Sequence, residues 1–170
     1  KFFKGRLATI FEKEDFDRKF INAALATGNE NIFGLYLVLD VLREFKDDER
    51  FLKVVDGFRR MNNIVKDFTS KNKDTIPGKV DEGLCELEQE KRLSHIAREL
   101  NEMVAALSGK DRTQYAAVLN YIATIKTDID NFFDKVMVMH EKVEIKLNRL
   151  AILNCAVESV TKLINIEMLQ

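Results

Sequence analysis

Apolar residues recur every three or four positions along most of this chain. Five segments show the pattern clearly, at residues 3–11, 51–68, 93–107, 115–136 and 143–164. Residues at this spacing share one face of an α-helix, and each apolar face must be covered by another element. The pattern therefore predicts long helices that pack against one another, most economically as antiparallel neighbours with short connections.

Polar stretches that contain glycine or proline predict where the helices end. They lie at residues 27–29, 70–81 and 108–111, and the second of them contains Pro77 and Gly78. The chain has only seven glycines and one proline, which is few for a protein built from strands and tight turns. We expect residues 70–81 to form a flexible connection between two long helices.

The segment 32–42 has two interpretations, because it is apolar almost all round. It suits either a central helix or a buried strand. We favour the helix, since no second candidate strand is present to pair with it. The prediction is an all-α protein, an antiparallel bundle of about six to seven helices that forms one domain over residues 1–170.

Composition narrows the class of protein. Hydrophobic residues make up 46% and charged residues 32%, which is typical of a globular protein. No window approaches the roughly 18–20 unbroken apolar residues that span a bilayer, so we expect no membrane partner. The net charge of −1 is low for a nucleic-acid domain, so an RNA-binding surface would have to be local. The chain begins with Lys1, and we expect it to be part of a longer protein.

No motif for catalysis or for a metal is present. Glycine-rich phosphate loops, hydrolase motifs and zinc-binding patterns are absent from the sequence. Cys85 and Cys155 lie far apart, as do His95 and His140, without the clustered spacing of a ligand set. Two unpaired cysteines fit a reducing cytosol. We therefore predict no catalytic residue and no metal or cofactor site within the chain.

Basic residues gather in two places. The first group is opposed between residues 57 and 73 by Asp67 alone, and consists of Arg59, Arg60, Lys66, Lys71 and Lys73. On a helix, Arg59, Asn63 and Lys66 share a polar stripe, and cations beside an amide can hold phosphates and read a base edge. The alternative is an ordinary solvated face.

The second group lies at four- and three-residue steps near the start of the last helix and consists of Lys142, Lys146 and Arg149. These side chains should line the edge of the apolar stripe, with their charges reaching solvent or a ligand. Ion pairing with Glu141 and Glu144 is the alternative interpretation.

Several segments carry a more specific signal. Residues 130–139 read D-N-F-F-D-K-V-M-V-M, residues 148–153 read N-R-L-A-I-L, and residues 58–66 read F-R-R-M-N-N-I-V-K. Together with residues 3–7 and 21–26, they resemble the C-terminal region of the β subunit of bacterial-type glycyl-tRNA synthetase, over nearly the whole chain. Arg59, Arg60, Asn63 and Arg149 match the family pattern, whereas Lys146 replaces a family arginine and keeps only its charge.

The resemblance implies a helical anticodon-binding domain of the DALR type. It implies tRNA(Gly) and the synthetase α subunit as partners in a heterotetramer, no DNA partner, and a cytoplasmic location. The parent enzyme would attach glycine to its tRNA with ATP and Mg²⁺, while this chain would bind tRNA without catalysing the reaction. The candidate tRNA-binding residues are Arg59, Arg60, Asn63, Lys66, Lys146 and Arg149. The alternative is a structural module that docks on the α subunit or on the rest of the β subunit.

Overall fold

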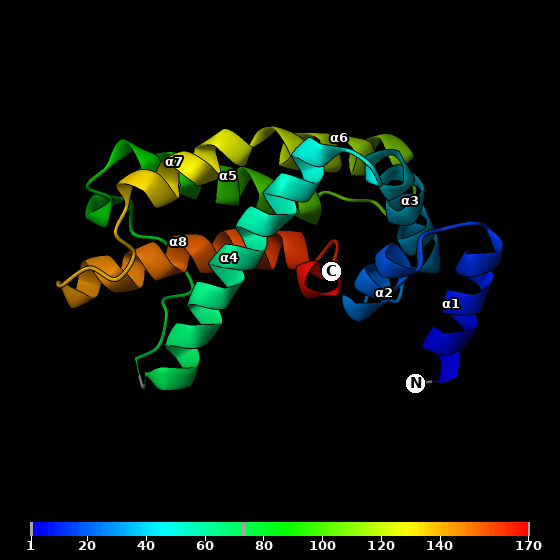
Figure 1. Ribbon diagram of the computed structural model, residues 1–170, viewed down its shortest axis with the longest axis horizontal. Helices are drawn as coiled ribbons and strands as arrows, with labels where there is room; N and C mark the ends of the chain where they lie inside the picture. Colours follow the sequence, from blue (N-terminus) through cyan, green and yellow to red (C-terminus); the bar gives the residue numbers. More distant parts are fainter. Residues whose placement is uncertain (1, 73, 170) are drawn as a thin grey trace.

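All regular structure in the described residues, 2–72 and 74–169, is helical (Figure 1). The computed structural model contains α1 (Phe2–Lys13), α2 (Arg18–Ala26), α3 (Ile32–Leu42), α4 (Glu49–Lys71), α5 (Glu88–Ala105), α6 (Arg112–Thr124), α7 (Lys126–Lys135) and α8 (Val143–Thr161), with short 3-10 turns η1 (Arg43–Phe45), η2 (Glu82–Leu84) and η3 (Ile166–Met168). The predicted all-α class is confirmed. The side chain of Phe3 and the basic residue Lys73 lie outside the described residues.

Helices end at each of the three breaks that the sequence predicts. Gly28 follows α2 and Gly109 follows α5, and both adopt the left-handed backbone conformation, with φ of 77° and 70°. Asp111 then starts α6 by accepting a hydrogen bond from the Thr113 amide at 2.9 Å. The third break separates the end of α4 from η2. Whether residues 70–81 are flexible stays a prediction.

The segment 32–42 is a helix, as predicted, and its bounds coincide with those of α3. It is apolar almost all round because most of its residues are buried, including Leu35, Val38 and Leu42. The stripe at 115–136 differs from the expectation of one helix. It forms two helices, α6 and α7, which meet at Ile125. Ile125 is itself buried, so the apolar pattern continues through the break without a signal.

Two long helices, α5 and α8, form the centre of the molecule and run in the same direction (Figure 1). Glu90 at the start of α5 contacts Arg149 near the start of α8, whereas Asn101 near the end of α5 contacts Lys162, which follows α8. The α6–α7 segment returns antiparallel to both. Because α8 packs against α5 and α4, it is buried on nearly all sides rather than along one stripe.

α4 crosses α8 diagonally, and the short helices α1, α2 and α3 lie at one end (Figure 1). Close approach of α4 to α7 depends on Gly57, since a Cβ atom there would lie 2.9 Å from the Ile129 Cγ2 atom. η3 packs against both α2 and α4, and the amide of Asn165 donates a hydrogen bond to the Ala23 carbonyl at 2.9 Å. The chain's last turn is thereby placed beside α4.

Candidate nucleic-acid interface

α4 presents a polar face because most of its apolar residues point inward. The predicted stripe is confirmed in full, since its seven members are buried: Phe51, Val54, Val55, Phe58, Met61, Val65 and Phe68. Arg60, Asn63 and Lys66 are consequently exposed on the opposite face, and Arg59 is half-buried. The crest of this face, centred on Asn63, separates two sides with different electrostatics.

On the side toward η3, the cations are already neutralised. Arg59 donates from Nη1 to Asp56 at 2.7 Å and from Nη2 to the Leu169 carbonyl at 3.2 Å, and its Nε is buried without a hydrogen-bond partner among the described residues. Lys66 pairs with Glu167 of η3. The chain's last turn therefore supplies the carbonyl and carboxylate that occupy these cations, and Glu167 has no counterpart in the sequence prediction.

On the side toward the α7–α8 connection, two predicted cations rest on aromatic rings instead. The Arg60 guanidinium carbon lies 3.8 Å from the ring centre of Phe133, and the Lys146 Nζ lies 5.6 Å from that of Phe68. Within the described ranges, neither cation has a carboxylate at ion-pair distance. A cation–π contact orients a cation without cancelling its charge. Arg60 and Lys146 thus remain able to attract an external anion.

Arg149 requires a correction, because the structure places it in the interior. Its side chain is 4% exposed and pairs with Glu90, which is 1% exposed. Its Nη2 reaches Glu86 at 3.2 Å, and its Nη1 donates to the Met137 carbonyl at 3.0 Å. RNA could not reach this guanidinium without displacing α5. Arg149 is therefore a structural residue that joins α5, α8 and the α7–α8 connection.

The six predicted residues thus fall into three groups. Arg149 is enclosed, Arg59 and Lys66 are occupied by the chain itself, and Arg60, Asn63 and Lys146 are accessible. The spacing that placed Arg59 and Lys66 together is correct. Residue spacing does not reveal the position of η3, which lies beside α4 only after folding.

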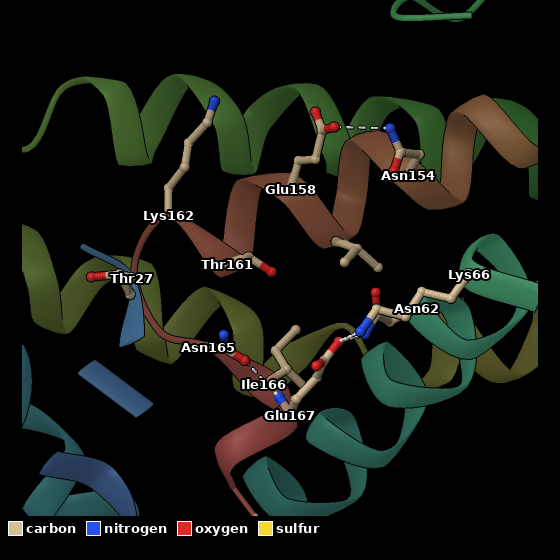
Figure 2. Close-up of a pocket in the computed structure, with 11 residues that line it drawn as sticks. Thr27, Asn62, Lys66, Asn154, Glu158, Thr161, Lys162, Asn165, Ile166 and Glu167 are labelled. Carbon is tan, nitrogen blue, oxygen red and sulfur yellow. Dashed lines mark hydrogen bonds and ion pairs between the residues drawn. The ribbon is translucent and has the colours of Figure 1, made fainter. Parts of the chain in front are cut away.

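A cleft of about 450 Å³ opens between α4, α8 and η3 (Figure 2). Its apolar lining comes from Val157 and Ile166. The Thr161 hydroxyl, the Asn62 amide and the Glu167 carboxylate point toward the opening, as Figure 2 shows. Sequence reasoning missed this cleft, since its residues come from segments about a hundred positions apart, as the contact between Asn62 and Glu167 illustrates.

Three further observations concern metal ligands, membrane helices and cysteines. In the part of the chain that the structure describes, no group of three or more His, Cys, Asp or Glu side chains is arranged to hold a metal ion. In the same part, no helix is both long and apolar enough to cross a membrane. Cys85 and Cys155 are not joined by a disulfide, and burial raises the pKa of both thiols.

Comparison with known families shows to which family the chain belongs. The profile of the DALR anticodon binding domain matches residues 56–170, which includes most of α4 and everything after it. The chain belongs to the DALR anticodon binding domain family. In this DALR domain, the accessible residues Arg60, Asn63 and Lys146 all lie inside the matched region.

Individual relatives agree with this assignment. The chain is 32% identical over 146 residues to the glycine–tRNA ligase beta subunit of Acidobacterium capsulatum, which covers 84% of the chain and 20% of the relative. It is 30% identical over 168 residues to that of Neisseria meningitidis serogroup C, covering 99% and 23%, and 30% identical over 169 residues to that of Solidesulfovibrio magneticus, covering 99% and 24%. The chain therefore spans about a fifth of the length of these relatives.

Proposed function

We propose that this chain binds the anticodon arm of tRNA(Gly) as a module of a glycine–tRNA ligase beta subunit. The support is the family match over residues 56–170 combined with an accessible polar crest on α4 inside that match. Arg60 and Lys146 would hold phosphates, and Asn63 would offer its amide to the edge of an unstacked base. Arg149 has no part in this surface, because it is enclosed.

The parent enzyme, on this proposal, is a cytoplasmic assembly of α and β subunits that joins glycine to tRNA(Gly) with ATP and Mg²⁺. The chain would contribute binding and no catalytic step. The proposal about the parent enzyme is supported by the name of the relatives, which are glycine–tRNA ligase beta subunits. The α subunit is thus a proposed partner through the parent assembly.

The deciding experiment measures tRNA(Gly) binding by the protein at several salt concentrations. Arg60→Ala and Lys146→Ala should each weaken binding and reduce the slope of log affinity against log salt by about 1, because each removes one phosphate contact. Lys110→Ala is the matched control, since it removes the same charge from an exposed site in the α5–α6 connection. If the two test variants behave like Lys110→Ala, the proposed surface is wrong.

A docking function has one observation in its favour. Met137, Met139 and Val143 are 69%, 48% and 49% exposed around the α7–α8 connection. Exposed methionines are common on protein-binding surfaces because their side chains adapt to a partner. If Met137→Ser and Met139→Ser weaken assembly with the α subunit and leave tRNA affinity unchanged, the connection is a docking surface. Unchanged assembly would exclude it.

A further inference from the structure

One pair of hydrogen-bond donors on α4 is already filled by a carboxylate of the chain's last turn. The Lys66 Nζ and the Asn62 Nδ2, one helical turn apart, both donate to the Glu167 Oε1, the latter at 2.5 Å (Figure 2). An ammonium and an amide are also donors that bind phosphate oxygens in complexes with nucleic acids. The Glu167 carboxylate therefore lies where a phosphate oxygen could bind.

This ion pair is open to solvent, and its donors are not saturated. The Lys66 side chain is 59% exposed and that of Glu167 is 42% exposed, and ion pairs at such positions are weak. The ammonium has three N–H donors and the amide has two, and one of each is directed to Glu167. A phosphate can therefore contact both groups before the carboxylate leaves.

Release of the carboxylate does not require η3 to move. Ile166 and Leu169 are buried, and the Asn165 amide is hydrogen-bonded to α2, so the backbone of the turn is fixed on both sides of Glu167. Rotation of the Glu167 side chain alone would free its partners. Arg59 differs, because it donates to the backbone carbonyl of the buried Leu169 and stays occupied.

We propose that Lys66 and Asn62 form a phosphate site, which Glu167 fills in the free protein and an RNA phosphate takes over on binding. Cations provide most of the non-specific attraction for RNA, so a carboxylate that cancels one of them lowers the affinity for polyanions in general. Arg60 and Lys146 then become the first contacts, and Lys66 joins them by exchange. This inference rests on the proposed function, since it adds a regulated contact to the same RNA surface.

Glu167→Gln separates the charge from the shape of this contact. The hydrogen bond from Lys66, followed by that from Asn62, lowers the pKa of the Glu167 carboxyl, so the native group is ionised at neutral pH. Glutamine keeps a carbonyl oxygen for Lys66 and loses the charge. Glu158→Gln is the matched control, because Glu158 lines the same cleft but accepts from the Asn154 amide at 3.0 Å and pairs with no cation within the described ranges.

Titration with inorganic phosphate tests the site without RNA. The side-chain amide signals of Asn62 in an NMR spectrum should report phosphate binding that is roughly two- to fivefold tighter in Glu167→Gln than in the native protein, the range expected for loss of one exposed ion pair. Glu158→Gln should leave the phosphate affinity close to the native value. Equal affinities in the two variants would overturn the inference.

A double-mutant cycle with tRNA(Gly) tests the exchange itself. Glu167→Gln should tighten tRNA binding roughly two- to fivefold in the native background and clearly less in a Lys66→Gln background, because only the first gain includes release of the ion pair. Simple repulsion between Glu167 and the RNA predicts equal gains in both backgrounds, and that result would refute the exchange.

Two outcomes distinguish this inference from the proposed function. If Arg60→Ala weakens tRNA binding while the two gains from Glu167→Gln are equal, the exchange is wrong although the module still binds tRNA. If Arg60→Ala and Lys146→Ala leave tRNA binding unchanged while phosphate binds more tightly to Glu167→Gln than to Glu158→Gln, the phosphate site is correct and the proposed RNA surface is wrong.

Discussion

Replacing Glu90 with glutamine should destabilise the protein far more than any exposed carboxylate does. Glu90 pairs with Arg149, and both side chains are almost completely buried. Its other oxygen, Oε2, accepts hydrogen bonds from the amides of Glu86 at 2.6 Å and Leu87 at 3.1 Å, which caps the start of α5. Glutamine can retain the capping contacts through its carbonyl oxygen, but its NH2 group then faces the Arg149 Nε–H, so the substitution removes both the charge and the hydrogen bond to Arg149.

The expected loss of stability follows from the charged partner that Arg149 no longer has. Loss of one partner from a buried ion pair costs about 3–5 kcal/mol, because the other charge stays desolvated. Glu86 remains 3.2 Å from the Arg149 Nη2, and its side chain is 48% exposed, so it offsets part of that cost. We expect a loss of about 3 kcal/mol in the free energy of unfolding, or about 6–12 °C in Tm for a chain of this size.

Urea unfolding followed by circular dichroism measures this loss. Glu88→Gln is the control, since Glu88 is 83% exposed and pairs with Lys91 at the surface; its effect should stay within about 0.5 kcal/mol. In a double-mutant cycle, Arg149→Met combined with Glu90→Gln should be more stable than Arg149→Met alone, because the unpaired carboxylate is gone. Equal effects of Glu90→Gln and Glu88→Gln, or strict additivity in the cycle, would refute the reasoning.

Three other predictions concern the cap of α4 and two helical glycines. The hydrogen bond from the Arg50 side chain, aided by backbone amides, lowers the pKa of Asp48 from 3.8 to about 2, so the stabilisation from this helix cap should be present above pH 4 and disappear as the pH falls to about 2. An NMR titration of the Asp48 carboxyl with a midpoint near 4 would contradict this. Gly5→Ala should raise stability by about 0.5–1 kcal/mol, because a Cβ there meets no atom within 4 Å. Gly57→Ala should instead lower stability by about 1–3 kcal/mol in the same urea assay, since its Cβ would press on Ile129, and a gain would disprove the close approach.

The parts of the fold that sequence predicts are those decided within one helix. The α4 stripe is confirmed because burial on one face repeats every three or four residues, and this repeat is visible without any partner. α3 could be assigned as a helix by elimination, since the chain offered no strand to pair with it. The bend at Ile125 gave no such signal, because a buried apolar residue continues the pattern.

The site was predicted less well because it depends on contacts between distant segments. Arg149 follows the same spacing as Lys146, yet only the position of Glu90 on α5 explains why one is buried and the other reaches the surface. Likewise, Lys66 is a free cation in the sequence and a partner of Glu167 in the structure. Spacing along a helix identifies which residues share a face, whereas the fold decides which of them meet a carboxylate.

The tie between the last turn and the first helices bears on any attempt to shorten the protein. The family match begins at Asp56, inside α4, so trimming to it would remove Phe51, Val54 and Val55 from the buried side of that helix. It would also remove Ala23, whose carbonyl accepts the Asn165 amide just before η3. A trimmed version would therefore keep every residue of the recognised family and still lose the support that positions Glu167. The helices before the match therefore hold residues within the match in position.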